Sequence, residues 1–307
     1  LGTIFLFIQM SQMLFRPLRQ IADKFNTLQM GMVATERIFK IFDTKSSIEN
    51  NGTISPKALK GDIAFNQLHF SYVPGEQVLN GISLNIKAGE TIAIVGATGA
   101  GKSTIINLLS RFYEYESGDI TIDTISIKDF ELNSLRKHLA VVLQDVFLFA
   151  DSLFNNITLF NPNITRENVT IAAKKIGVHE FIKSLPGGYN YNVKERGVML
   201  SSGQRQLIAF LRAYITQPAI LILDEATSSV DSYTEEIIQK AIDTLTQGKT
   251  SIVIAHRLAT VKNADRIIVM DQGKIVEQGT HKELLSVADG FYTKLYEVQF
   301  AEVVPPV

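Results

Sequence analysis

One short segment constrains the fold of this chain more than any other feature of its sequence. It reads Gly96, Ala97, Thr98, Gly99, Ala100, Gly101, Lys102 and Ser103, and fits the pattern G-x-x-x-x-G-K-[ST]. A buried strand is predicted before it at 91–95, and a helix after it from about 102 to 112. Glycines let backbone N–H groups turn inward around phosphate oxygens, and the helix N-terminus adds its positive dipole. The segment therefore predicts a phosphate-binding loop, in which Lys102 reaches the β- and γ-phosphates and Ser103 ligates Mg²⁺.

A second apolar run, residues 220–223, ends in two neighbouring carboxylates, Asp224 and Glu225, with Asp224 128 residues after Gly96. Side chains alternate along a strand, so the two carboxylates face different directions at its carboxyl end. This arrangement predicts that Asp224 serves the Mg²⁺ shell. Glu225 then faces the γ-phosphate, where it can polarise the attacking water.

The composition is that of an ordinary globular protein of one large domain or two modest ones. Of the 307 residues, 46% are hydrophobic and 20% charged, which excludes a disordered or collagenous chain. Cysteine is absent, so disulfides and thiolate chemistry are excluded. After residue 60 the chain holds 22 basic and 27 acidic residues, and this mildly acidic balance argues against a broad nucleic-acid-binding face.

The N-terminal segment is apolar up to Arg16 and then continues with a helical pattern to Phe42. Fifteen helical residues span roughly 22 Å, less than the ~30 Å hydrocarbon core, and basic residues follow the apolar run rather than precede it. We expect the cytoplasmic end of a membrane helix that begins upstream; the alternative is an amphipathic soluble helix. Pro17 is expected to bend or restart the helix, and the polar residues 43–60 are expected to form a linker.

From residue 61 onward, short apolar runs alternate with helical stretches. The predicted strands lie at 78–86, 91–95, 120–122, 139–143, 220–223 and 251–255, with a hairpin at 267–277. Residues 151–217 show no strong strand pattern and are expected to be mostly helical, for example at 167–183 and 204–215. The expected architecture is an α/β sheet core interrupted by a helical insert.

A further motif precedes the predicted helix at 204–215. Its residues are Leu200, Ser201, Ser202, Gly203 and Gln204. This motif resembles the LSGGQ signature of ABC ATPases, and together with the phosphate loop and the acidic strand it makes residues 61–300 similar to the nucleotide-binding domain of an ABC transporter. The resemblance implies a P-loop NTPase fold of the ABC-ATPase type, with a mixed sheet core and a helical subdomain at about 151–217.

The resemblance also implies roles for individual residues around ATP and Mg²⁺. Gln144 is similar to the Q-loop glutamine, which contacts Mg²⁺ or the attacking water and senses the membrane domain. His256 is similar to the switch histidine that bridges Glu225 and the γ-phosphate. Asp231 belongs to a segment that resembles the D-loop, and Tyr72 is similar to the adenine-stacking aromatic. The other implied nucleotide-binding residues are the loop 96–103 with Thr104, and, acting on the nucleotide of a partner domain, Ser201, Ser202, Gly203 and Gln204.

The sequence departs from the family pattern at two places. Ser202 stands where the first signature glycine is usual. The loop 191–197 resembles the exporter-type TEVGERG loop, with Asn192 and Lys194 replacing a Glu and a Gly.

The N-terminal region is similar to the end of the last transmembrane helix of a type I exporter, close to the lipid and multidrug exporter branch. The expected organisation is a membrane-helix end and cytoplasmic extension at 1–42, a linker at 43–60, an ATPase domain at 61–300 and a tail at 301–307. The resemblance implies a head-to-tail dimer with a second ATPase domain, contact with a transmembrane domain, and a place on the cytoplasmic face of the inner membrane. The expected function is ATP hydrolysis coupled to export or flipping of a lipid or hydrophobic substrate.

Two alternatives remain open on the sequence. One is a soluble ABC ATPase acting on nucleic acid or ribosomes. Its coiled-coil members need a longer separation than 128 residues between loop and acidic strand, and its translation-type members carry two ATPase domains in tandem. The other is a non-hydrolytic regulatory module, which Glu225 and His256 disfavour.

Overall fold

The computed structural model describes residues 2–44, 48–224, 232–255 and 257–300, without the side chains of residues 232, 299 and 300. The chain divides into two units, Leu1–Glu49 and Asn50–Val307. The boundary lies inside the segment 43–60 that the sequence predicts as a linker.

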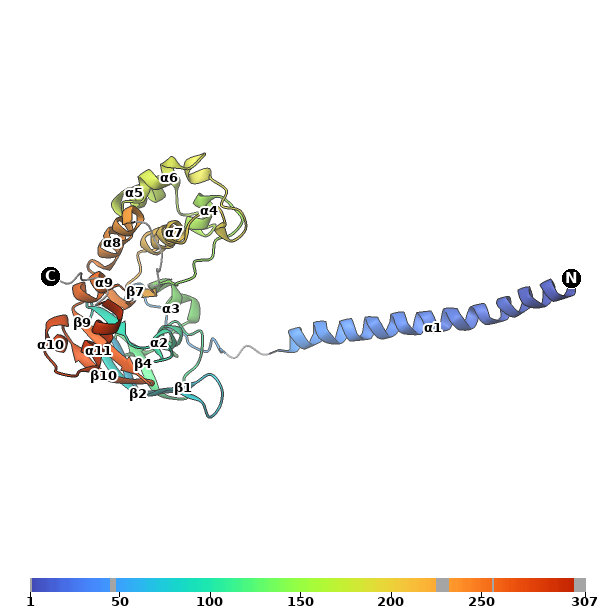
Figure 1. Cartoon of the computed structure of the whole chain (residues 1–307), viewed down its shortest axis with the longest axis horizontal. Coiled ribbons are helices and arrows are strands. Elements are labelled where there is room, and N and C mark those ends of the chain that lie inside the picture. The colour runs from blue at the N-terminus through green and yellow to red at the C-terminus, as the bar shows by residue number, and fades with distance from the viewer. Residues whose placement is uncertain (1, 45–47, 225–231, 256, 301–307) are drawn as a thin grey trace. The chain divides into compact units, whose positions relative to one another are not determined.

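The first unit is a single long helix, α1 (Gly2–Asp43), drawn in blue in Figure 1. Pro17 lies inside this helix, so the expected restart there is wrong. A proline removes one intrahelical hydrogen bond, and the bonded turns on both sides can keep the helix continuous. The large apolar side chains from Ile4 to Phe42 are all at least 43% exposed, and none of the helix's residues is buried. Among the described residues, no helix combines the length and apolarity that crossing a membrane requires.

The second unit contains a six-stranded sheet of order β10-β9-β3-β8-β7-β6. Its strands are β3 (Thr91–Val95), β6 (Leu139–Val142), β7 (Ile220–Asp224), β8 (Thr250–Ile254), β9 (Arg266–Asp271) and β10 (Lys274–Gly279). All neighbours pair in parallel except β9 and β10, which form the expected hairpin. The central strand β3 is buried over residues 92–95, which explains its continuous apolar sequence.

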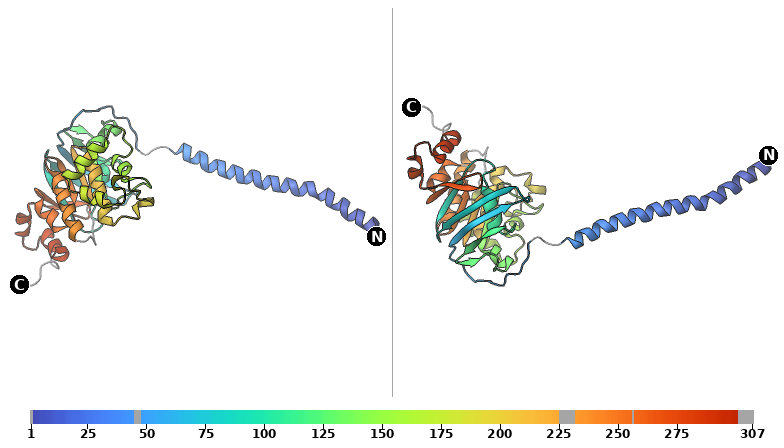
Figure 2. Two further views of the ribbon diagram at one scale, coloured as in Figure 1. Left: turned by 90° about the horizontal axis from the view of Figure 1, so that it is seen from above. Right: turned by 90° about the horizontal axis from the view of Figure 1, so that it is seen from below.

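A second, antiparallel sheet has the order β2-β1-β4-β5. Its strands are β1 (Ile63–Ser71), β2 (Gln77–Ile86), β4 (Ser117–Ile122) and β5 (Ile125–Ser126). Figure 2 shows these strands beside the larger sheet in the view from below. The strand β1 was not predicted from the sequence, and the two sheets together make the mixed α/β core that the resemblance implies.

Alternate residues of the six-stranded sheet face two separate hydrophobic cores. Ile92 and Ile94 of β3 belong to the core shared with the antiparallel sheet and with helices α2 (Lys102–Leu109) and α3 (Leu132–His138). Ala93 and Val95 belong to the core shared with the helical segment. Burial on both faces fixes the register of β3, and therefore the point at which the loop 96–101 leaves the sheet.

Residues 151–217 are mostly helical, as expected. The helices are α4 (Leu153–Thr158), α5 (Arg166–Lys175), α6 (His179–Ser184) and α7 (Ser202–Ile215), with short 3-10 turns at Gly188–Asn190 and Glu195–Gly197. The continuous helix expected at 167–183 is wrong, because Gly177 adopts a φ of +81° between α5 and α6. Helix α2 is likewise shorter than expected and ends at Leu109, before Arg111 with its φ of +49°.

The remaining helices lie in the C-terminal third. They are α8 (Ser232–Thr246), α9 (Leu258–Asn263), α10 (His281–Leu285) and α11 (Phe291–Phe300).

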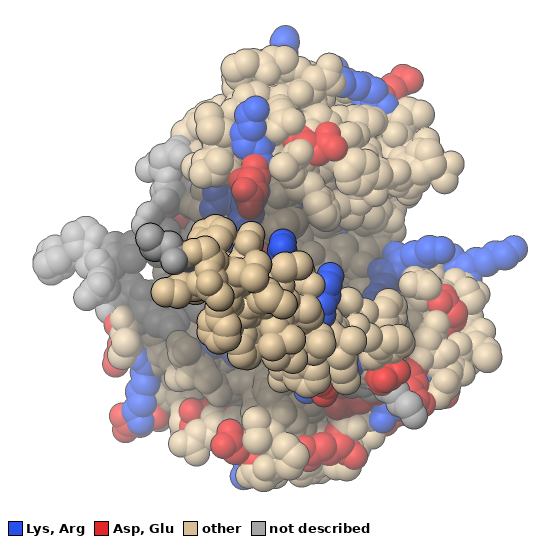
Figure 3. Space-filling model, turned by 90° about the vertical axis from the view of Figure 1, so that its right-hand side faces the viewer, with Lys and Arg blue, Asp and Glu red and all other residues tan. Residues whose placement is uncertain are grey.

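Figure 3 shows Lys and Arg side chains interspersed with Asp and Glu on the face that it presents. This mixture agrees with the near balance of 30 basic and 31 acidic residues in the chain.

Residues 50–60, the first residues of the second unit, contact the segment at the start of α3. The backbone N–H groups of Thr53 and Ile54 both donate to the carbonyl oxygen of Asp129, at 3.0 Å each. The side chain of Asn50 accepts a hydrogen bond from the N–H of Leu132 at 2.8 Å. The second half of the predicted linker is therefore attached to the folded part of the second unit.

We expect deletion of residues 1–49 to leave nucleotide binding unchanged and to improve solubility, since it removes the exposed apolar helix and none of these contacts. Deletion of residues 1–60 should also lower the melting temperature, because it removes the hydrogen bonds to Asp129 and Leu132. Thermal unfolding with and without ATP compares the two truncations. Loss of ATP binding in the shorter truncation would contradict the division at Glu49.

Candidate active site

The phosphate loop connects β3 to α2, and two of its glycines are required by their surroundings. Gly96 has a φ of +153°, and a Cβ there would lie 2.2 Å from the carbonyl oxygen of Met270 in β9. Gly101, the N-cap of α2, has a φ of +97°, and a Cβ there would lie 2.7 Å from Leu79 Cδ2. Both positions combine a backbone conformation that L-residues rarely adopt with close packing. The glycines of the motif thus hold the loop against β9 and β2.

The Lys102 ammonium lies over this loop. Its Nζ donates hydrogen bonds to the carbonyl oxygens of Gly96 at 2.7 Å and Ala97 at 2.9 Å. Half-burial lowers the pKa of Lys102, and the nearby Asp224 carboxylate opposes part of that shift. The loop thus carries a positive charge at the N-terminus of a helix, where its backbone already favours anions.

Ser103 and Asp224 come together at the end of β7 although they lie 121 residues apart, with Ser103 Oγ 3.5 Å from Asp224 Oδ2. A hydroxyl and a carboxylate are the hard oxygen ligands that Mg²⁺ prefers, usually with substrate phosphates and waters completing the octahedron. Among the described residues, no three His, Cys, Asp or Glu side chains gather into a metal site. This donor set fits Mg²⁺ carried by a phosphate ligand.

Loop, helix and strand ends surround one cavity of about 610 Å³. The predicted residues that line it are Tyr72, Thr98, Gly99, Gly101, Lys102, Ser103, Thr104, Gln144 and Asp224. Val78 and Ile254 also line it and were not predicted, because a single apolar residue in a strand carries no sequence signal that separates a ligand contact from core packing. One cavity therefore joins an aromatic side chain, a cationic loop and a pair of oxygen ligands.

The signature residues lie elsewhere in the chain. Ser201 is the N-cap of α7: its Oγ accepts a hydrogen bond from the N–H of Gln204 at 3.2 Å, and Gln204 Oε1 accepts one from the N–H of Ser201 at 3.0 Å. Ser201 and Ser202 are exposed, whereas Gly203 is buried. Since the cavity is not lined by residues 201–204, a single chain does not bring them to its own phosphate loop.

Three predicted site residues, Glu225, Asp231 and His256, lie outside the described residues. Asp224, next to Glu225, and Ile254, two residues before His256, end two adjacent strands. Asp224 pairs with Ile254 across β7 and β8. Asp224 and Ile254 both line the cavity.

Residues 79–228 match the family model of the ABC transporter. These residues form an ABC transporter domain. The fold and the phosphate loop, acidic strand and signature motif are thus those of an ABC ATPase domain, as the sequence predicted.

Named relatives extend the similarity to nearly the whole chain. A probable multidrug resistance ABC transporter ATP-binding/permease protein of Bacillus subtilis (strain 168) is 44% identical over 97% of this chain and 44% of the relative. An ATP-dependent lipid A-core flippase of Legionella pneumophila (strain Lens) is 44% identical over 97% of this chain and 50% of the relative. The chain spans about half the length of these curated relatives.

Among solved structures, a bacterial Atm1-family ABC exporter with ATP bound has 37% sequence identity and a TM-score of 0.82. The match covers 96% of this chain and 51% of the exporter chain. The ABC ATPase domain and the segment before it thus resemble the corresponding half of an exporter.

Proposed function

We propose that this chain is the ATP-hydrolysing part of an ABC exporter, in which MgATP-driven pairing of two ATPase domains drives export or flipping of a lipid or hydrophobic substrate. The observation that carries the proposal is the cavity in which Tyr72, Lys102 and Asp224 meet. An aromatic ring suits a purine, the loop and its lysine suit phosphates, and Ser103 with Asp224 suits Mg²⁺. The soluble ABC ATPase is not favoured, since the similar proteins above are named as a permease, a flippase and an exporter.

In the proposed mechanism, different residues bind the phosphates, activate the water and complete the site from a second domain. Lys102 and the backbone N–H groups of the loop hold the phosphates, and Ser103 with Asp224 would hold a Mg²⁺ ion, which would supply charge neutralisation. Glu225, next to Asp224 in the sequence, takes the proton of the attacking water, with Gln144 and His256 orienting that water and the γ-phosphate. Ser201 to Gln204 complete the site from a second domain, which explains why they do not line the cavity of their own chain.

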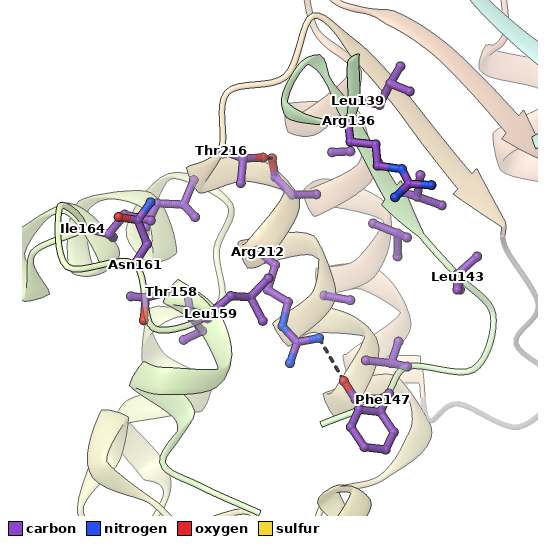
Figure 4. A pocket seen from close by; sticks show the side chains of 18 of the residues that line it. Arg136, Leu139, Leu143, Phe147, Thr158, Leu159, Asn161, Ile164, Arg212 and Thr216 are labelled. Atoms are coloured by element: carbon purple, nitrogen blue, oxygen red, sulfur yellow. Dashed lines mark hydrogen bonds between the residues drawn. The ribbon is translucent and has the colours of Figure 1, made fainter. Parts of the chain in front are cut away.

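A groove next to the nucleotide cavity is a suitable surface for the transmembrane domain. It has a volume of about 580 Å³ and lies between the edge strand β6 and helices α4 and α7, lined by Leu143, Phe147 and Leu159 among others. Figure 4 shows Arg212 of α7 pointing toward the carbonyl oxygen of Phe147, to which it donates at 2.9 Å. Burial lowers the pKa of Arg212 to about 10, so it is still charged at neutral pH.

The same short segment borders both cavities. Leu143 and Asp145 line the groove, and Gln144 between them lines the nucleotide cavity. A partner that occupies the groove therefore acts on the residue that is expected to contact Mg²⁺ and water. This arrangement supports a coupling between the membrane domain and ATP hydrolysis at Gln144.

The proposal is tested first at Lys102. Lys102→Ala is expected to abolish the thermal stabilisation by ATP, which is about 2.7 kcal/mol for a ligand at 100 times its dissociation constant. Lys87→Ala is the matched control, because Lys87 lies exposed on the turn between β2 and β3. Differential scanning calorimetry with and without MgATP measures both. An unchanged ATP effect in Lys102→Ala would refute the phosphate-binding role.

A further inference from the structure

The hydroxyl group of Tyr72 is fixed by two hydrogen bonds. Tyr72 follows β1, is 44% exposed and lines the nucleotide cavity. Its hydroxyl donates a hydrogen bond to Thr104 Oγ1 at 3.3 Å and accepts one from Asn107 Nδ2 at 3.0 Å. Thr104 and Asn107 lie one turn apart on α2, the helix that begins with Lys102 and Ser103. The hydroxyl thus ties the aromatic ring to the helix that carries the phosphate ligands.

The ring of Tyr72 is also fixed by two aromatic neighbours. The Phe70 ring lies 4.8 Å away, centroid to centroid, at an interplanar angle of 86°. The Tyr113 ring lies 4.9 Å away at 88°. Such edge-to-face contacts favour one orientation of the ring over others. The hydroxyl and the ring edges therefore define one position for an exposed tyrosine that would otherwise sample several rotamers.

Asn107 contacts Tyr72 but does not itself line the nucleotide cavity. It is absent from the cavity lining, whereas Thr104 and Tyr72 are part of it. Its half-buried amide donates to Tyr72 and stands five residues along α2 from Lys102. The side-chain contact that connects Asn107 to the cavity is therefore its hydrogen bond to Tyr72.

We propose that Asn107 is a positioning residue for the nucleobase: it holds Tyr72 in the orientation that stacks on adenine, at a fixed place relative to the phosphate-binding end of α2. This inference rests on the proposed function, namely that the cavity binds ATP. Ordering of a mobile side chain on binding opposes association, and a ring held in place before binding avoids most of that cost. Asn107 thus contributes to affinity for the base and not to affinity for the phosphates.

The test compares two ligands, MgATP and Mg-tripolyphosphate, which carries the phosphates without the base. Asn107→Leu should weaken the affinity for MgATP by about 2- to 12-fold, the range that corresponds to ordering one side chain. Its affinity for Mg-tripolyphosphate should stay within about twofold of the wild type. Isothermal titration calorimetry gives both dissociation constants. Asn85→Leu, at an exposed position of β2 outside the cavity, is the matched control.

A second variant, Tyr72→Phe, keeps the aromatic ring and removes its hydroxyl group. Tyr72→Phe should lose at least as much MgATP affinity as Asn107→Leu, because it also removes the hydrogen bond to Thr104. The double variant should bind MgATP no more weakly than Tyr72→Phe alone, because Tyr72→Phe already breaks the hydrogen bond that Asn107→Leu removes. If Asn107→Leu does not fold, Tyr72→Phe still tests whether the hydrogen bonds of the Tyr72 hydroxyl contribute to MgATP affinity, since this variant retains the aromatic packing.

The outcomes separate this inference from the proposed function. If the wild-type chain binds neither ligand, the proposed function fails. If the wild type binds MgATP and Asn107→Leu binds it equally well, the positioning role is wrong. Equal weakening of both ligands would also overturn it, because that result means that the substitution disturbs α2 and the phosphate loop. Additive losses in the double variant would show that Asn107 does not act through the Tyr72 hydroxyl.

Discussion

Glu225→Gln is expected to lower the rate of ATP hydrolysis by about 10²- to 10⁴-fold, equivalent to about 2.7 to 5.5 kcal/mol of barrier, and to leave MgATP binding in place. The amide has the shape of the carboxylate and can still hydrogen-bond water, but it cannot accept the proton. Asp224, which is expected to serve Mg²⁺, is unchanged in this variant. Release of inorganic phosphate under saturating MgATP measures the rate.

Slow hydrolysis should also make the paired state visible. If the nucleotide is shared between Lys102 of one chain and Ser201 of another, Glu225→Gln should form a dimer with MgATP and not with MgADP, which lacks the γ-phosphate. Light scattering detects this dimer, and adding Ser201→Arg should disperse it without loss of monomer binding. Glu236→Gln, an exposed change of the same charge on α8, is the control. Wild-type turnover in Glu225→Gln would exclude it as the base, and an inactive but monomeric variant would exclude head-to-tail pairing in this chain.

The parts of the fold that the sequence predicted are those in which one local pattern is strong enough to dominate. The strand β3 is buried on both faces, so its sequence is continuously apolar, and the loop after it follows a fixed glycine spacing. The strand β1 was missed for the opposite reason. Its pairing with β2 shifts register between Phe65 and Leu68, and Gln67 has a φ of +45°. Phe65 and Leu68 are both fully buried, three residues apart, so the alternation expected of a strand is broken.

The same reasoning separates the predicted and the unpredicted parts of the site. Lys102, Ser103 and Asp224 belong to motifs, and the fold brings them to one cavity. The hydrogen bond between Asn107 and Tyr72 joins residues 35 positions apart, and although the resemblance points to Tyr72, no motif includes Asn107. Contacts of this kind depend on how β1 packs against α2, which periodicity along the chain does not encode. For that reason Val78 and Asn107 became visible only in the structure.

Gly96→Ala is expected to destabilise the loop strongly, and it tests the geometry of the loop without removing a charge. The added Cβ would lie 2.2 Å from the carbonyl oxygen of Met270, far inside van der Waals contact, so the backbone of β9 or of the loop must move. Overpacking costs about 1 to 3 kcal/mol. The strained backbone at a φ of +153° adds about 1 to 3 kcal/mol more for a residue with a Cβ.

The expected loss of stability is therefore about 2 to 6 kcal/mol, together with loss of the stabilisation by MgATP. Gly89→Ala is the matched control: Gly89 also has a positive φ, +79°, but a Cβ there would meet no atom within 4 Å. It should cost only the roughly 1 to 2 kcal/mol of the left-handed conformation and keep ATP binding. Urea unfolding with and without MgATP measures the free energy of unfolding and the stabilisation by MgATP for both variants. Because the two substitutions differ mainly in the contact with Met270, equal stability and equal ATP response would mean that the loop is not held against β9.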